Sequence, residues 1–343
     1  MRIGYVPISA TMTSPGDRRR FVYWARTRGV EFEPATPTGN YDVVVVSSAA
    51  DVTQWARVKS AKLVFDLVDS YFAIPRSDWR GLLRGTAKFV SRQHRFFEPD
   101  HWKALAQMCR RSEAVVCSTE EQRRDISRFN ENVHVILDVH SAATRTSKVD
   151  YAPHQPFRFV WEGLPFTLPQ LFALAPVLAA LPQPWELHVV TNPTAPRWLA
   201  RFGKLDVRQA LARVFPTAVF HVWTDDTFAN VVTACDLALI PLDLDDPFTR
   251  GKPENKLLLF WRVGLPVAAA ASPAYERAMK ATGFGLASRD ANEWATTLRR
   301  LMTDQRLREQ SASAGRAWAE REHSEQKILE RWDAVMASVG VTA

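Results

Sequence analysis

The sequence predicts an α/β protein built from two doubly wound, Rossmann-like domains with mainly parallel sheets. Short apolar runs recur along the whole chain, and stretches with helical spacing separate them. The runs are continuous rather than alternating, as in YDVVVVSS at 41–48, which indicates strands buried on both faces. Strands that alternate with helices in this way pair in parallel. A polar, proline-bearing segment without periodicity, 141–156, divides the chain in two.

Each half repeats the same order of strand and helix. The strands predicted in the first half cover 2–6, 41–48, 62–69, 113–119 and 133–138. Those predicted in the second half cover 157–163, 185–192, 218–223, 236–242 and 265–272. We therefore expect an N-terminal domain at 1–145, a C-terminal domain at 155–318, and a final helix at 319–343 that packs back toward the first domain. Ligands of doubly wound sheets bind at the carboxyl ends of the strands, so a cleft between the two domains is expected there.

The composition is that of a globular protein. The 343 residues suffice for two domains of ordinary size, and 46% of them are hydrophobic and 24% charged. No apolar window reaches the roughly 18 residues of a membrane-spanning helix, and the N-terminus lacks the apolar core of a signal peptide. The three cysteines have no metal-ligand spacing, so a reduced, cytoplasmic setting is expected.

The charge balance favours an anionic partner. Lysine and arginine exceed the acidic residues by seven (44 minus 37), which suits a nucleotide, an acidic lipid surface or a nucleic acid. No nucleic-acid recognition motif accompanies the charge, so no nucleic-acid partner is expected.

The stretch KPENKLLLFWRVGLPV at 252–267 is the most informative part of the chain. Pro253 suits the first turn of a helix, where free backbone N–H groups and the helix dipole favour a diphosphate. Arg250, Lys252 and Lys256 add cations that would neutralise a leaving nucleoside diphosphate. The alternative is ordinary capping, in which Glu254 is a favourable first-turn charge and the lysines are solvated.

Five segments in order, VWEG, HVVTN, HVW, ACDLALIPL and PENKLLLFWRVGLPVAAAAS, resemble the C-terminal donor domain of GT-B glycosyltransferases of the group-1, family 4-like class. EAVVCSTEEQRRDI with VHVILD is similar to the end of their N-terminal domain, and KILERWDAVM is similar to their closing helix. The resemblance implies a GT-B fold, with two Rossmann-like domains facing a central cleft and a C-terminal crossover helix. It also implies an enzyme that moves a sugar, of hexosyl or deoxyhexosyl type and with retention, from a nucleotide-sugar donor to a glycan, lipid-linked or other acceptor. The resemblance is not to the metal-dependent transferase class, so no metal and no other cofactor is expected.

Two features of that family are missing here. Its glutamate three residues after the motif lysine, which binds the ribose, is replaced by Leu259, and the E-x7-E signature is absent. The basic pair after the first strand of the second domain is absent from EGLPFTLPQ at 162–170. These departures support an alternative: a catalytically degenerate GT-B protein that binds a nucleotide or assists a partner transferase.

Strand ends of the second half supply the other candidates for the donor site. Trp223 could stack on a base, Thr191 or Asn192 could bond to it, and Gly163 would let the donor approach closely. A turn and ordinary core packing are the competing interpretations. We expect the diphosphate to meet Arg250, Lys252, Asn255 and Lys256. We expect the nucleoside or sugar to meet Glu162, Gly163, Thr191, Trp223 and Glu254.

The first half supplies candidates for the acceptor side. SPGDRRRF at 14–21 follows the first strand, and Gly16, Asp17 and Arg18 would touch the acceptor, although turn, cap and solvated charge explain them equally. Asp66 and Asp69 lie at the carboxyl end of the strand at 62–69, and Asp69 is the candidate general base of an inverting reaction, with a turn or cap role as the alternative. His94 is the second catalytic candidate, and His140 follows it.

A basic and aromatic stretch lies at 78–97. Arg80, Arg84, Lys88 and Arg92 recur every four residues beside Trp79, Leu83 and Phe89, a combination typical of an interfacial helix on anionic lipid. The stretch therefore predicts peripheral attachment at the inner face of the membrane and a lipid-linked or surface-polysaccharide acceptor. The alternative is a surface helix whose apolar side packs on the sheet, with Gly81 and Gly85 weakening it.

Overall fold

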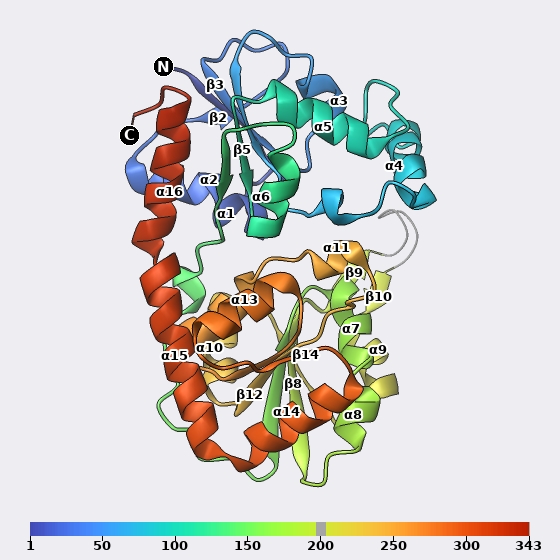
Figure 1. Ribbon diagram of the computed structural model, residues 1–343, viewed down its shortest axis with the longest axis vertical. Coiled ribbons are helices and arrows are strands. Elements are labelled where there is room, and N and C mark those ends of the chain that lie inside the picture. The colour runs from blue at the N-terminus through green and yellow to red at the C-terminus, as the bar shows by residue number, and fades with distance from the viewer. Residues whose placement is uncertain (197–203, 343) are drawn as a thin grey trace. The chain divides into compact units, whose positions relative to one another are not determined.

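A computed structural model describes residues 1–196 and 204–342, and the chain divides into two compact units. The first unit comprises Met1–Val139, Gly251–Pro253 and Glu325–Ala343. The second comprises His140–Arg250 and Glu254–Ser324. Each unit contains a six-stranded sheet with helices packed around it (Figure 1). The predicted doubly wound α/β class is thereby confirmed.

The first sheet has the strand order β2-β1-β3-β4-β5-β6, and all its pairs are parallel. Its strands are β1 (Ile3–Val6), β2 (Glu33–Pro34), β3 (Val43–Ser47), β4 (Lys62–Asp66), β5 (Ala114–Cys117) and β6 (Val133–Val135). Alternate valines of β3 serve two different cores: Val43 and Val45 belong to one, Val44 and Val46 to the other. The continuous apolar run therefore reflects burial on both faces.

Helices cover both faces of this sheet. They are α1 (Pro15–Arg18), α2 (Phe21–Arg28), α3 (Val52–Trp55), α4 (Trp79–Val90), α5 (His101–Arg111), α6 (Glu120–Ile126) and α16 (Glu325–Ser338), with a 3-10 turn at Tyr71–Ala73. The C-terminal helix α16 completes one of the two cores, where Trp332 lies 6.1 Å from the ring of Phe21. The indole N–H of Trp24 donates to Asp333 at 2.7 Å. The last helix of the chain is thus part of the first unit.

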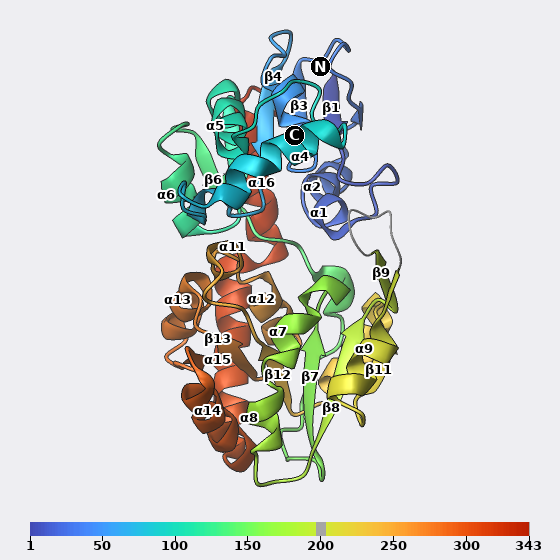
Figure 2. The ribbon, with the colours of Figure 1, turned by 90° about the vertical axis from the view of Figure 1, so that its right-hand side faces the viewer.

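The second sheet has the order β11-β8-β7-β12-β13-β14, again with parallel pairs, and Figure 2 shows β13, β12, β7, β8 and β11 in this sequence. Its strands are β7 (Phe157–Glu162), β8 (Trp185–Thr191), β11 (Val219–Val222), β12 (Leu237–Ile240), β13 (Val267–Ala270) and β14 (Ala287–Ser288). A separate antiparallel pair is formed by β9 (Thr194–Pro196) and β10 (Lys204–Asp206). The helices of this unit are α7 (Leu168–Phe172), α8 (Ala175–Ala179), α9 (Val207–Val214), α10 (Asp225–Thr233), α11 (Pro247–Arg250), α12 (Asn255–Arg262), α13 (Pro273–Ala281), α14 (Ala291–Thr303) and α15 (Gln305–His323), and 3-10 turns lie at Ser141–Ala143 and Pro165–Thr167.

Every strand predicted from an apolar run is present. The four strands that were not predicted, β2, β9, β10 and β14, have only two or three residues each. A run that short carries no periodicity from which to recognise it. No helix in the described part of the chain is long and apolar enough to cross a membrane.

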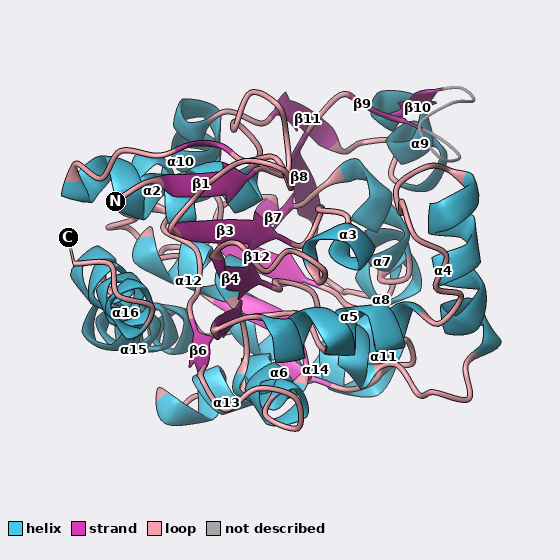
Figure 3. Cartoon of the chain, turned by 90° about the horizontal axis from the view of Figure 1, so that it is seen from above, coloured by secondary structure: helices cyan, strands magenta, loops and turns pink. Residues whose placement is uncertain are grey.

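The structure of α4 contradicts two interpretations of the basic stretch. The helix ends at Val90, and Arg92 follows it in the left-handed region with φ 60°, so Arg92 does not continue a stripe on one helix. The alternative interpretation, in which the apolar side packs on the sheet, is also wrong, because α4 packs on α5 through its glycines. A Cβ at Gly81 would lie 1.2 Å from the Trp102 ring, and one at Gly85 would lie 2.1 Å from the Glu98 carbonyl oxygen. Figures 1 and 3 show α4 farther from the first sheet than α5 is.

Gly85→Ala tests this packing. Alanine is the better helix former by about 1 kcal/mol, but its methyl group would meet the backbone of residues 98 and 99, which cannot rotate away. We expect a net loss of about 1–3 kcal/mol for the α4–α5 contact, measured as faster amide hydrogen exchange in α4. Gly285→Ala, where a Cβ meets no atom within 4 Å, is the matched control. Unchanged or slower exchange in the Gly85 variant would contradict the close approach.

Candidate functional site

Lys256 occupies the carboxyl end of β7 in the second unit. It lies in the first turn of α12, and its Nζ donates to the carbonyl oxygen of Glu162 at 2.8 Å. The same ammonium lies 5.3 Å from the centre of the Trp161 ring. In a doubly wound sheet, this strand end is where ligands bind. The fold therefore holds a cation at the expected position.

Gly163 makes room for that cation. A Cβ at this position would lie 2.7 Å from Lys256 Nζ and 2.6 Å from the Trp161 ring. The hydroxyl of Thr191, at the end of β8, donates to the Gly163 carbonyl oxygen at 2.5 Å and so fixes the loop. Four predicted donor residues, Glu162, Gly163, Thr191 and Lys256, thus come together from three different elements. Thr191 is buried and supports the loop.

The start of α12 carries a buried acid. Glu254 precedes the helix and pairs with Arg277 of α13 at 3.3 Å. Burial raises the pKa of the neighbouring Tyr275, and the negative charges of Glu254 and Glu162 raise it further. The sequence alone did not indicate that Arg277 and Tyr275 lie near this acid, because both belong to the next helix of the chain, α13. Glu254 is therefore part of a charge network and not a solvated cap.

The remaining donor candidates come from several segments of the second unit and differ in how exposed their side chains are. Asn255 is the half-buried first residue of α12, and Arg250 is exposed at the end of α11. Trp223 follows β11 and is half-buried, and its backbone N–H donates to the Thr191 carbonyl oxygen at 3.1 Å, which places it beside the end of β8. Asn192 is exposed. Leu259, where the resembled family has its ribose-binding acid, is only 2% exposed.

In the first unit, an arginine ties three elements together at the carboxyl end of the sheet. Arg20 is fully buried, and its guanidinium donates to both carboxylate oxygens of Asp66, at 2.8 and 2.6 Å. It also donates to Asp138 at 3.2 Å and to the Ile136 carbonyl oxygen at 2.8 Å. The arginine thus fixes the ends of β4 and of the segment after β6 to the start of α2.

Asp17 organises the loop between β1 and α1. Its buried carboxylate accepts hydrogen bonds from the Tyr5 hydroxyl at 2.7 Å, the Ile8 N–H at 2.7 Å and the Ser14 hydroxyl at 2.7 Å. Burial alone would raise the pKa of Asp17, but these bonds outweigh it and hold the pKa below its usual value. The observation favours the structural interpretation of Asp17. Gly16 packs beside Ile8, and Arg18 is half-buried in the same short helix.

Asp69 follows β4 at the carboxyl end of the first sheet. Burial raises its pKa, and the positive charges of Lys252 and Arg84 partly offset that effect. The segment that carries Lys252 is anchored here, because the Ser70 hydroxyl donates to the Gly251 carbonyl oxygen at 2.6 Å. Arg84 also donates to the Tyr71 hydroxyl at 3.2 Å. A carboxylate with a raised pKa beside two cations has the properties of a general base.

His94 is buried beside His101 and away from Asp69. It is 2% exposed, and its ring lies 5.5 Å from that of His101. Burial and then the charge of Lys88 lower its pKa, so the ring is neutral. Among residues 1–196 and 204–342, no hydrogen bond joins His94 to Asp69. His140, in the second unit, lies 2.7 Å from the guanidinium of Arg262.

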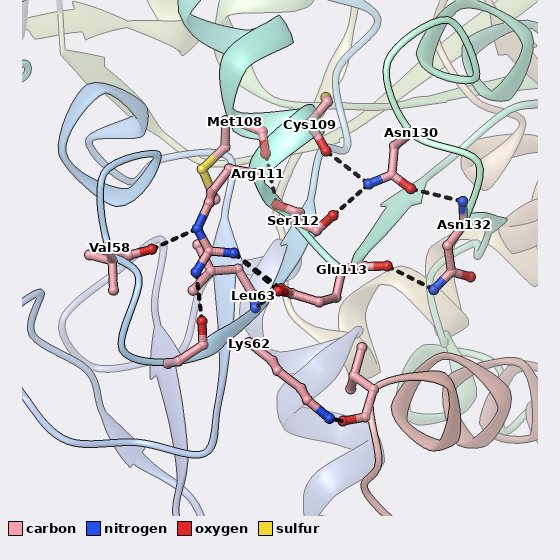
Figure 4. A network of polar contacts seen from close by, with 12 residues as sticks. Val58, Lys62, Leu63, Met108, Cys109, Arg111, Ser112, Glu113, Asn130 and Asn132 are labelled. Atoms are coloured by element: carbon pink, nitrogen blue, oxygen red, sulfur yellow. Dashed lines mark hydrogen bonds and ion pairs between the residues drawn. The ribbon is translucent and has the colours of Figure 1, made fainter.

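The opposite end of the first sheet carries a polar network with a structural role (Figure 4). Arg111 donates to the carbonyl oxygens of Val58 and Ala61, at 2.6 and 2.7 Å, and pairs with Glu113 at 3.1 Å. Asn130 donates to the carbonyl oxygens at the end of α5. These groups satisfy backbone at the amino ends of β4 and β5, where doubly wound sheets do not bind their ligands. No group of three or more metal-ligating residues is found in the described part of the chain.

Solved structures with this fold include three instructive ones. HepE from Anabaena, solved with UDP and glucose, is 13% identical over 98% of this chain and 100% of its own, with a TM-score of 0.66. Sucrose-phosphate synthase from Thermosynechococcus elongatus is 12% identical over 93% and 76%, with a TM-score of 0.61. TarM from S. aureus, solved with UDP, is 13% identical over 87% of this chain, with a TM-score of 0.53, and this chain spans 55% of its length.

These likenesses confirm the GT-B fold that the resemblance implied: two Rossmann-like units, each with a parallel six-stranded sheet. No protein-family profile matches the chain, and no curated protein sequence matches it. The identities are low, so the likeness concerns the fold.

Replacing Arg20 tests the ionic cluster. Arg20→Met would leave the buried carboxylate of Asp66 and the half-buried carboxylate of Asp138 without their cation, at a cost of about 3–5 kcal/mol. We expect a lower urea midpoint for the first unit, followed by near-ultraviolet circular dichroism. Arg26→Met, which removes an exposed arginine of α2, is the control and should change little. Equal midpoints in the two variants would show that Arg20 does not hold the strand ends.

Proposed function

We propose that the protein is a glycosyltransferase that moves a sugar from a nucleotide-sugar donor to a glycan, lipid-linked or other acceptor. The observation that carries the proposal is Lys256, which the fold holds beside Gly163 at the carboxyl end of β7. HepE, which matches 98% of this chain in fold, has been solved with UDP-glucose. UDP-sugars are therefore the first donors to test.

The chemistry follows from where charge develops. When the glycosidic bond to the nucleotide breaks, negative charge accumulates on the leaving diphosphate. An ammonium group and the backbone N–H groups at the start of α12 stabilise that charge. In this proposal Lys256, Arg250, Lys252 and Asn255 serve the diphosphate without a metal ion. Glu162 and Trp223 serve the sugar or base.

The first prediction concerns the two cations. Lys256→Ala should weaken UDP binding by about tenfold or more, because a charge-assisted bond to phosphate is lost. Arg250→Ala should weaken it less, because this side chain is exposed. Isothermal titration calorimetry with UDP and UDP-glucose measures both. Lys280→Ala, an exposed lysine of α13, is the matched control. Unchanged affinity in both variants would remove α11 and α12 from the donor site.

The second prediction concerns Asp69 as the base that deprotonates the acceptor hydroxyl. Asp69→Asn should leave UDP affinity unchanged and lower the transfer rate by about a hundredfold or more. Release of UDP from the donor, followed with and without candidate acceptors, measures the rate. Retained transfer would exclude Asp69 as the base and favour a retaining reaction, which needs no such residue in this domain.

One observation favours a second candidate function, that of a degenerate GT-B protein. Leu259 is buried in α12, so the position of the missing ribose-binding acid belongs to the core. A protein that binds UDP without any transfer would fit this alternative. A protein that transfers sugar would have to recognise the ribose through other groups.

A further inference from the structure

Helix α4 exposes the residues that an ordinary surface helix would bury. Trp79, Leu83 and Val90 are 64%, 53% and 76% exposed. Spacings of four and seven residues place these three side chains on one face of the helix. A helix on a globular protein normally turns such a stripe toward the core. Here the stripe faces outward.

The side of α4 that faces α5 leaves no room for the helix to rotate and bury its apolar stripe. Gly81 and Gly85 approach the Trp102 ring and the backbone at 98–99 so closely that no larger side chain fits. The indole N–H of Trp102 is itself bonded to the Tyr71 carbonyl oxygen at 2.7 Å, so the ring is held in place. The large apolar side chains therefore have no room on the side toward α5.

Two phenylalanines extend the apolar surface beyond the helix. The rings of Phe89 and Phe97 lie 5.3 Å apart in an edge-on contact, and both are exposed. Exposed apolar patches of this kind mark interaction sites. We call the surface formed by Trp79, Leu83, Phe89, Val90 and Phe97 the α4 patch.

The α4 segment is rich in positive charge, although Asp78 and Glu98 flank it and the Asp51 carboxylate accepts a hydrogen bond from the Arg95 N–H. Residues 79–97 contain five cations and no acid. They are Arg80, Arg84, Lys88, Arg92 and Arg95. Arg84, Arg92 and Arg95 are exposed, and the side chains of Arg80 and Leu82 lie outside the described residues. Burial lowers the pKa of Lys88, the charge of Arg84 lowers it further, and the charge of Asp51 partly offsets both effects.

We propose that the α4 patch docks this protein on the surface of an anionic lipid bilayer. Aromatic and aliphatic side chains would enter the region of the headgroups, and the flanking cations would pair with anionic lipid. A second copy of this chain fits the patch poorly, because a two-fold contact would bring the same cations face to face. The proposal does not depend on the transferase activity.

Vesicle sedimentation tests the charge requirement. The full chain should bind vesicles of phosphatidylcholine with 30% phosphatidylglycerol and bind pure phosphatidylcholine at least tenfold more weakly. Changing Lys88, Arg92 and Arg95 to Gln should reduce binding by about fivefold per cation, the equivalent of about 1 kcal/mol each. The matched control changes Arg299, Arg300 and Arg306 to Gln, which removes the same charge from exposed positions of α14 and α15. Arg84 is left in place because it contacts Tyr71 beside the candidate base.

A fluorescent label tests whether the patch itself meets the lipid. The three native cysteines are buried, so Val90→Cys can be labelled selectively with an environment-sensitive dye. Its emission should shift to shorter wavelength on anionic vesicles, while the same dye on Lys280→Cys should not shift. Trp79→Ser with Leu83→Ser should weaken binding and leave UDP affinity unchanged.

Three results would overturn the proposal. One is equal loss of binding in both triple-Gln variants, which would reduce the effect to net charge. Another is no shift of the dye at position 90 on either kind of vesicle. The third is concentration-dependent dimerisation in sedimentation velocity that Trp79→Ser with Leu83→Ser abolishes, because a second copy would then cover the patch.

Discussion

When both faces of a parallel sheet are buried, polar side chains are accommodated mainly at the ends of the strands. In each unit of this protein, helices cover both sides, and most side chains within the strands are apolar. Charged groups therefore gather where strands stop. Asp66 ends β4 and meets Arg20, while Glu162 ends β7 and receives Lys256 through its carbonyl oxygen. The ionic cluster in one unit and the candidate donor site in the other are consequences of the same constraint.

The two strand ends use their charges differently. Arg20 is buried, and its guanidinium bonds to acceptors of the protein itself, so its charge has a structural role. Lys256 donates to the Glu162 carbonyl oxygen and lies beside Gly163, where a Cβ would meet its ammonium. Asp69 lies between these extremes, with a pKa raised by burial and two cations close by. Arg20 is therefore a structural charge, whereas Lys256 and Asp69 are the residues for which a chemical role is proposed.

The sequence predicted the strands well because most strands of four or more residues contain an apolar run, as in β3, β5 and β12. It also singled out Lys256, because a lysine in the first turn of an apolar helix is visible as a pattern. Its partner was not predictable in the same way, since Glu162 is 94 positions earlier and only the sheet brings the two together. The same holds for Arg20 with Asp66 and for Glu254 with Arg277. The orientation of α4 was missed for a related reason: it depends on how closely Trp102 approaches Gly81.

The place of α16 in the first unit has a consequence for how the protein is made. The ribosome completes the whole second unit before it synthesises Ile328, Leu329 and Trp332, which belong to the core that β1 and α2 begin. During translation, one apolar face of the N-terminal sheet therefore stays only partly covered while the next 185 residues (324 minus 139) are synthesised. The first unit to be synthesised is thus the last to be finished. A premature stop codon near residue 325 would damage the beginning of the chain and spare the residues just before the stop.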